Sequence, residues 1–119
     1  MDAVLTERRP NQGMIEIKAD GCRISLPLLQ IIFVEIIGKT AVFHCEREYK
    51  THMRFSDIEM MLSGKGFLRI QRSYIINMAH CVGIRNYQAI LDDGRALPCS
   101  RQEYPALVQN FMRWKGMNR

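Results

Sequence analysis

Short runs in which hydrophobic and polar residues alternate fill most of this chain, and this period of two is typical of strands with one buried face. The first two runs are residues 14–18 (Met-Ile-Glu-Ile-Lys) and residues 22–26 (Cys-Arg-Ile-Ser-Leu), with the hairpin turn signal Asp20-Gly21 between them. We therefore expect these segments to pair as a β-hairpin. Residues 31–37 form a nearly continuous β-branched run instead, which predicts a strand in the interior of a sheet.

Later apolar runs follow at similar spacing and are separated by turn signals such as Gly38-Lys39-Thr40 and Asp92-Asp93-Gly94. They predict further strands at residues 41–45, 49–53, 67–71, 81–85, 87–91 and 95–97. Many short strands joined by tight turns predict a mostly β domain with short α-helices.

Two segments have helical spacing rather than strand spacing. Residues 55–62 predict a short helix, in which Ser56 and Glu59 have the spacing of a capping box. Residues 102–114 predict a closing amphipathic helix that covers the sheets. Its apolar stripe consists of Tyr104, Leu107, Val108, Phe111 and Met112.

The length of 119 residues predicts a single domain. We expect a loose leader at residues 1–13, the folded domain at 14–115 and a short tail at 116–119. No apolar run approaches the roughly 18 residues that span a bilayer, and the N-terminal residues lack the apolar centre of a secretory signal. The sequence therefore predicts a cytoplasmic protein whose four cysteines are free thiols.

No motif for a metal, a cofactor or catalysis is recognisable. The adjacent pairs His44-Cys45 and His80-Cys81 look like metal ligands, but neighbouring residues in a strand point to opposite faces. Ser73 and Ser100 have no nearby histidine in the sequence, and no glycine-rich phosphate loop follows a strand. We expect no cofactor, no metal site and no enzymatic activity.

The net charge of +5 is unevenly distributed. Residues 65–119 contain nine Lys and Arg against three Asp and Glu, whereas residues 1–64 contain eight against nine. This distribution favours a basic face with an anionic partner, although a solvated basic surface would have the same composition.

Two arginine-bearing segments lie in this basic half. Residues 67–77 read Phe-Leu-Arg-Ile-Gln-Arg-Ser-Tyr-Ile-Ile-Asn, and residues 97–101 read Leu-Pro-Cys-Ser-Arg. Each ends an apolar, strand-like run with arginine and small hydroxyl residues in a turn. Guanidinium groups form paired hydrogen bonds with phosphate or guanine edges, and hydroxyls bind phosphate oxygens. The two segments therefore predict binding of a polyanion.

The same segments resemble the LytTR family, the bacterial LytR/AlgR-type DNA-binding domains. Residues 31–35 with the Gly-Lys-Thr turn are similar to the family's I-x-y-I/V-E-x-x-G-N-Y, residues 67–77 to F-x-R-I/C-H-R-S-Y/F-L-V-N, and residues 97–101 to L-P-V-S-R. The three motifs come in the family's order and spacing, and the resemblance covers about residues 14–112. Gln71 stands where the family usually has His, and Lys39-Thr40 stands where Asn-Tyr is common.

The resemblance implies an elongated fold of small antiparallel sheets whose loops enter two successive major grooves of double-stranded DNA, without a recognition helix. Carried over by position, the DNA-binding residues are Lys39, Thr40, Ala41, Arg69, Gln71, Arg72, Ser73 and Arg101. Most members carry an N-terminal receiver domain, for which this chain has no room. The resemblance thus implies a transcriptional regulator without a receiver, or a fragment of a longer regulator.

The chemistry of these residues suggests different roles. Arg72 and Arg101 are the best candidates for base edges, where a bidentate pair with guanine discriminates by roughly 1–3 kcal/mol; phosphate binding or a surface ion pair is the alternative. Arg69 alternates with apolar neighbours, so we expect it to face outward toward phosphate. Ser73 could bind phosphate or cap its turn, and Lys39 could bind phosphate or guanine.

Other expectations concern the surroundings of these loops. Tyr74 and Asn77 are expected to support the middle loop from behind. We expect a monomer in solution, with a second copy on direct-repeat or paired half-sites in DNA. Two other non-enzymatic functions remain open: an RNA-binding β module, which would use exposed aromatic residues for base stacking, and a protein-interaction module that antagonises a related regulator.

Overall fold

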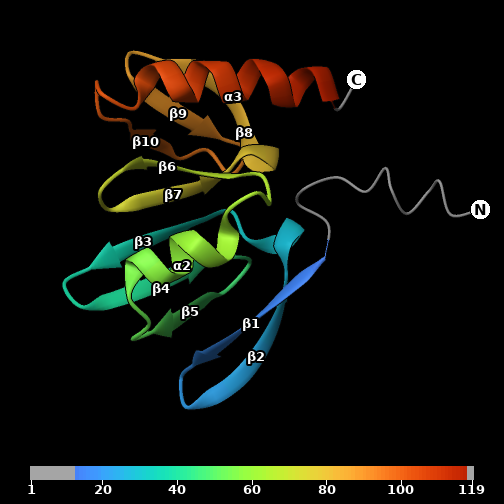
Figure 1. Cartoon of the computed structure of the whole chain (residues 1–119), viewed down its shortest axis with the longest axis vertical. Helices are drawn as coiled ribbons and strands as arrows, with labels where there is room; N and C mark the ends of the chain where they lie inside the picture. The colour runs from blue at the N-terminus through green and yellow to red at the C-terminus, as the bar shows by residue number, and fades with distance from the viewer. Residues whose placement is uncertain (1–12, 118–119) are drawn as a thin grey trace, which may run out of the picture.

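The structure is a computed structural model that describes residues 13–117, and within that range the chain forms three antiparallel sheets and two α-helices (Figure 1). The strands are β1 (Met14–Ala19), β2 (Cys22–Pro27), β3 (Phe33–Ile37), β4 (Thr40–His44), β5 (Glu48–Thr51), β6 (Phe67–Gln71), β7 (Tyr74–Asn77), β8 (Cys81–Arg85), β9 (Gln88–Leu91) and β10 (Ala96–Pro98). The helices are η1 (Leu28–Gln30), α2 (Phe55–Leu62), η2 (Met78–His80) and α3 (Tyr104–Met117). The predicted mostly β fold of small antiparallel sheets is confirmed. Residues 1–12 of the expected leader lie outside the described residues.

The N-terminal hairpin forms as its alternation predicts. β1 and β2 pair from Met14 opposite Pro27 to Ala19 opposite Cys22. The two turn residues, Asp20 and Gly21, have φ values of 52° and 78°. Both values lie in the left-handed region that a two-residue hairpin of this type needs, and glycine enters that region without steric cost.

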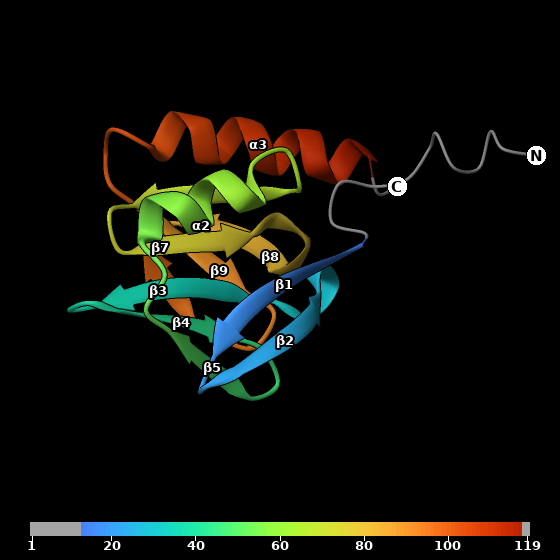
Figure 2. The ribbon, with the colours of Figure 1, turned by 60° about the horizontal axis from the view of Figure 1, so that its bottom comes forward.

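The five-stranded sheet has the order β5-β4-β3-β7-β6, with β3 at its centre. Around β3 and β7 both faces of this sheet are buried (Figure 2). Val34 and Ile75 belong to a core formed with the β1–β2 hairpin and α2. Phe33 and Ile76 belong to a second core, formed with the β8–β10 sheet and α3. Successive residues of each strand thus face different cores, which explains the continuous apolar run predicted as an interior strand.

Strand β7 is absent from the sequence-based expectation, although it joins β3 to β6. It lies between them in the sheet and pairs antiparallel with both. Its consecutive residues Ile75 and Ile76 are both buried, on opposite faces. The segment therefore lacks the alternation by which the other short strands were recognised.

Helix α2 has the predicted bounds, but the predicted capping box is wrong. The helix already begins at Phe55, whose side chain is only 8% exposed and packs into the first core. Arg54 therefore occupies the N-cap position without a side-chain cap, and Ser56 lies inside the helix. Glu59 instead contacts Arg69, with 2.8 Å between Oε1 and Nη1.

Helix α3 covers the second core as expected, and it continues to Met117. Leu107, a residue of this helix, is fully buried in the second core. The predicted apolar stripe is wrong at Met112, which is 67% exposed; Trp114 packs against the core together with Phe111. No helix within residues 13–117 is long and apolar enough to cross a membrane.

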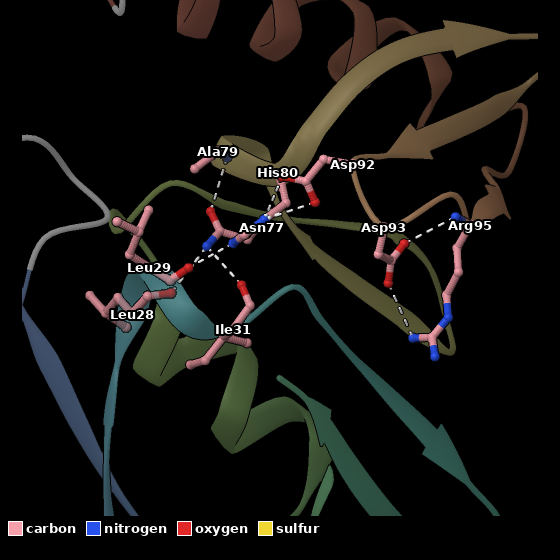
Figure 3. Close-up of polar contacts among 9 residues, drawn as sticks. All are labelled: Leu28, Leu29, Ile31, Asn77, Ala79, His80, Asp92, Asp93 and Arg95. Atoms are coloured by element: carbon pink, nitrogen blue, oxygen red, sulfur yellow. Dashed lines mark hydrogen bonds and ion pairs between the residues drawn. The ribbon is translucent and has the colours of Figure 1, made fainter. Parts of the chain in front are cut away.

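Asn77, the last residue of β7, lies at the junction of η1 and η2 (Figure 3). This side chain is fully buried, and its Nδ2 donates to the carbonyl oxygens of Leu28 at 3.1 Å and Ile31 at 2.8 Å. Its Oδ1 accepts from the Ala79 amide at 3.1 Å. Asn77 thus ties η1 to η2 at the end of the sheet opposite the β6–β7 turn, so the expectation that it supports that loop from behind is wrong.

His80 makes a second link at the same junction (Figure 3). Its Nδ1 lies 2.8 Å from Asp92 Oδ2, and its Nε2 lies 2.6 Å from the Leu29 carbonyl oxygen. Both partner atoms are oxygen acceptors. The ring therefore lies between η1 and Asp92, which directly follows β9.

We expect Asn77→Ala to lower the free energy of unfolding by about 2–4 kcal/mol, because two buried carbonyls and one amide lose their partner. Urea denaturation of the whole chain measures this change. Asn110→Ala is the control, since its amide donates only along α3, to Ala106 O at 2.8 Å. Its cost should stay below about 1 kcal/mol. Equal losses in the two variants would contradict a special role for the junction.

The four cysteines are free thiols, as the sequence predicts. Cys22 is exposed, whereas Cys81 and Cys99 are buried and Cys45 is half-buried. Burial raises the pKa of the Cys45 thiol to about 11. Burial also raises the pKa of Cys81, and burial together with the Glu103 carboxylate raises that of Cys99.

Because the thiolate is the reactive form, a thiol reagent at mildly alkaline pH should modify Cys22 first. We expect one fast thiol and three slow ones in the native protein, and four fast thiols in denaturant. Cys22→Ser should remove the fast phase from a spectrophotometric titration. A fast phase that persists in this variant would show that one of the other thiols is open to solvent.

Candidate nucleic-acid interface

Three connections lie along one edge of the molecule, on the left in Figures 1 and 2. They are the β3–β4 turn, the β6–β7 turn and the segment between β10 and α3. Antiparallel pairing brings the first two together, because Tyr74 at the start of β7 lies opposite both Glu35 near the end of β3 and Gln71 at the end of β6. The third reaches the same edge through Ser100, whose amide donates to the Ile70 carbonyl at 2.9 Å.

The β3–β4 turn is a two-residue turn formed by Gly38 and Lys39, between the paired residues Ile37 and Thr40. Gly38 has a φ of 63°, which favours glycine at this position. The turn projects Lys39 into solvent, and Thr40 is half-buried. Ala41 is fully buried in the first core. Its side chain therefore offers no surface to a partner, which removes it from the set of expected contact residues.

The β6–β7 turn consists of Arg72 and Ser73, and it follows a bulge in β6 between Arg69 and Gln71. Arg72 is exposed, and its guanidinium has no hydrogen-bond or ion-pair partner within residues 13–117. The Ser73 carbonyl accepts from the Ile36 amide at 3.0 Å. This hydrogen bond joins the second turn to β3, and so to the base of the first turn.

Arg69 holds the β6–β7 turn in place. Its Nη2 donates to the Arg72 carbonyl at 2.7 Å, and its Nη1 contacts the Glu59 carboxylate at 2.8 Å. The guanidinium also lies over the Phe55 ring, with its carbon 4.9 Å from the ring centroid. These contacts fasten the turn to α2. The expected contact of Arg69 with phosphate stays a prediction.

An open cleft of about 710 Å³ lies between the β6–β7 turn and the start of α3. Gln71 lies at this cleft, and its Nε2 donates across to the Pro98 carbonyl at 3.3 Å. Beyond Pro98, the Ser100 hydroxyl accepts from the Glu103 amide at 3.1 Å and fixes the turn that leads into α3. The Gln71 side chain, at the position where the family usually has His, therefore bridges two of the three connections.

Arg101 lies in the turn before α3 and is exposed. Its guanidinium carbon is 5.3 Å from the centroid of the Tyr87 ring, and the Tyr87 ring is 4.4 Å from that of Tyr104. Tyr87 belongs to the β8–β9 turn, and its carbonyl accepts from the Cys99 amide at 2.8 Å. The β8–β9 turn is therefore a fourth connection that is hydrogen-bonded to the same edge.

Lys39, Arg72 and Arg101 share one property: none has a carboxylate partner within residues 13–117. Of the acidic groups nearby, Glu59 pairs with Arg69, and Glu35 lies 2.7 Å from His44 Nε2. Glu103 lines the same cleft as Arg72 but forms no ion pair with it. Three cations on a rigid edge therefore face solvent, and such an arrangement attracts an anionic partner.

Two of the three histidines are engaged in the fold, and the third, His52, is exposed. His44 stacks on Phe33 with 4.2 Å between the ring centroids, and His80 contacts Asp92. Within residues 13–117, no group of three or more His, Cys, Asp or Glu side chains is arranged to hold a metal ion.

The β8–β9 turn is the part of this edge that sequence reasoning missed. Its residues Asn86 and Tyr87 lie between the paired residues Arg85 and Gln88. Asn-Tyr is not among the usual two-residue hairpin sequences, which carry glycine. The exposed Tyr87 was therefore assigned to a strand, and its contact with Arg101 left no signal in the sequence.

Comparisons with known proteins agree with the motifs. The model of the LytTr DNA-binding domain matches residues 21–112. A solved LytTr DNA-binding domain from Bacillus cereus has a similar structure, with a TM-score of 0.67 and 20% sequence identity over 85% of this chain and 97% of that chain. That identity is low enough for the likeness to show the fold alone. None of the curated proteins compared matches the chain. Because the family match spans most of the sequence and includes all three motifs, the chain belongs to the LytTR family of DNA-binding domains.

Proposed function

We propose that this chain binds double-stranded DNA sequence-specifically through the β3–β4 turn, the β6–β7 turn and the β10–α3 connection. It would act in the bacterial cytoplasm as the DNA-binding output domain of a transcriptional regulator. The observation that carries this proposal is that backbone hydrogen bonds fasten three cation-bearing connections to one edge. Within the part of the chain that the structure describes, the cations Lys39, Arg72 and Arg101 have no carboxylate partner. A rigid array of unpaired cations suits a regular array of phosphates and base edges.

The roles follow from the contacts of each side chain. Within residues 13–117, the guanidinium N–H donors of Arg72 and Arg101 have no hydrogen-bond or ion-pair partner, and both arginines are assigned to base edges. Lys39, Thr40 and Ser73 are assigned to phosphate or sugar. Gln71 has one amide hydrogen bond inside the protein and keeps its carbonyl oxygen for a base or a water.

The size of the domain suits contact with two turns of the groove. Its longest dimension is 44 Å, and successive major grooves on one side of B-DNA are about 34 Å apart. The three connections follow one another along the edge from β4 to α3 (Figure 1). We propose that loops at the two ends of that edge enter adjacent major grooves, with the cleft beside Gln71 facing the minor groove between them.

Selection of duplex DNA from a random pool by the whole chain tests the proposal. We expect an enriched motif, and two half-sites in it would support a second copy on DNA. Affinity for the selected duplex should fall with salt at a log–log slope of about −0.9 for each neutralised phosphate. Equal affinity for structured RNA, or a flat salt response, would favour an RNA-binding module. Absence of any binding to nucleic acid would favour a protein-interaction module.

Arg72→Ala and Arg101→Ala should each cost roughly 1–3 kcal/mol on the selected duplex and relax base preference at one position. Arg113→Ala is the matched control, because Arg113 is exposed on α3 beside Gly64 and Gly66, away from the three connections. It should leave the selected motif unchanged. Titrations against the selected duplex and a scrambled one separate the roles, since an equal loss on both would assign an arginine to phosphate.

A further inference from the structure

The β8–β9 turn has the backbone of a glycine turn without a glycine. Asn86 and Tyr87 have φ values of 52° and 60°. The β1–β2 turn has nearly the same geometry, with φ values of 52° and 78°, and there the second residue is Gly21. Asparagine tolerates the left-handed region, but an aromatic residue in it is strained by its Cβ. The fold therefore holds Tyr87 in a conformation that glycine would adopt more readily.

Core packing does not explain why a tyrosine occupies this position. The residue is 45% exposed, and it stands outside both hydrophobic cores. The Tyr87 ring contacts the Tyr104 ring, with 4.4 Å between the two ring centroids and 47° between the two ring planes. The ring also carries the Arg101 guanidinium, whose carbon is 5.3 Å from its centroid. Strain at an exposed position, combined with a contact to a candidate base-reading arginine, points to function rather than stability.

The contact between the Arg101 guanidinium and the Tyr87 ring leaves the arginine able to bind a second partner. A cation–π contact holds a guanidinium without pairing its N–H donors to an oxygen acceptor, so those donors stay available to a second partner. A carboxylate partner would occupy those donors. The contact also restricts a long side chain before binding, which lowers the entropy lost when the arginine is fixed on DNA.

A backbone hydrogen bond links the turn that carries Tyr87 to the segment that carries Arg101. The Tyr87 carbonyl accepts from the Cys99 amide at 2.8 Å, two residues before Arg101. The β8–β9 turn and the β10–α3 connection therefore cannot separate without breaking this hydrogen bond.

We propose that Tyr87 is a positioning residue that holds the Arg101 guanidinium in the orientation required for a base edge. This proposal rests on the proposed function, in which Arg101 reads DNA. The strained turn keeps the ring next to the guanidinium, and the ring also contacts Tyr104.

Tyr87→Gly tests the proposal because it removes the ring and relieves the turn together. We expect affinity for the selected duplex to fall about fivefold, with base preference relaxed at the position that Arg101→Ala affects. The melting temperature should change by less than about 4 °C, because relief of strain offsets the lost ring contact. Tyr87→Asn removes the ring with another residue that tolerates this backbone, and it should behave alike.

Two controls keep the ring. Asn86→Gly relaxes the neighbouring turn residue, and Tyr87→Phe removes only the hydroxyl; both should bind like the parent chain. The double variant Tyr87→Gly with Arg101→Ala should bind no more weakly than Arg101→Ala alone. Additive losses would overturn the proposal and assign the ring its own contact with DNA. Unchanged affinity in Tyr87→Gly would overturn it as well.

A measurement without DNA separates this proposal from the proposed function. The Arg101 side-chain resonances should show a ring-current shift in the free protein that is lost in Tyr87→Gly and kept in Asn86→Gly. If the parent chain bound no duplex, the proposed function would fail whatever this shift showed. If Arg101→Ala weakened binding but Tyr87→Gly did not, only the role of Tyr87 would fail.

Discussion

Burial of both faces of the five-stranded sheet around β3 and β7 constrains everything else in this structure. One face carries the β1–β2 hairpin and α2, and the other carries the β8–β10 sheet and α3. The faces of the sheet around β3 and β7 are therefore closed to a partner, whereas the turns along its edge stay exposed. Loops at one end carry the unpaired cations, while the other end is closed by the hydrogen bonds of Asn77. Under the proposed function, a domain built in this way would present turns to DNA rather than a helix or a sheet face.

Much of the architecture was predictable because each hairpin is local. The alternation in β1 and β2 and the Asp20-Gly21 turn fix that hairpin within a few residues of sequence. Strand β7 was not predictable, since Ile75 and Ile76 face different cores and only the assembled sheet shows why. The start of α2 was misplaced for a related reason: burial of Phe55 overrode the local capping pattern of Ser56.

The interface was predictable where a motif carries it and unpredictable where distant residues meet. The turns that bear Lys39, Arg72 and Arg101 lie together, as the motifs imply. The partners of Arg69 could not be read from the chain, because Glu59 and Phe55 reach it only through the packing of α2. Sequence patterns indicate the local structure around a residue. The contacts of Arg69 with α2 depend instead on the tertiary fold.

The link between Asn77 and Leu28 also constrains how the chain reaches its native state. The hairpins β1–β2, β3–β4, β6–β7 and β8–β9 each join neighbouring segments and can form early and independently. The β3–β7 pairing and the hydrogen bond from Asn77 to Leu28, 49 residues apart, must close a long loop that contains β4, β5 and α2. Docking of preformed hairpins on β3 should therefore limit the folding rate. The edge that carries the cations would then be assembled only in that last, cooperative step.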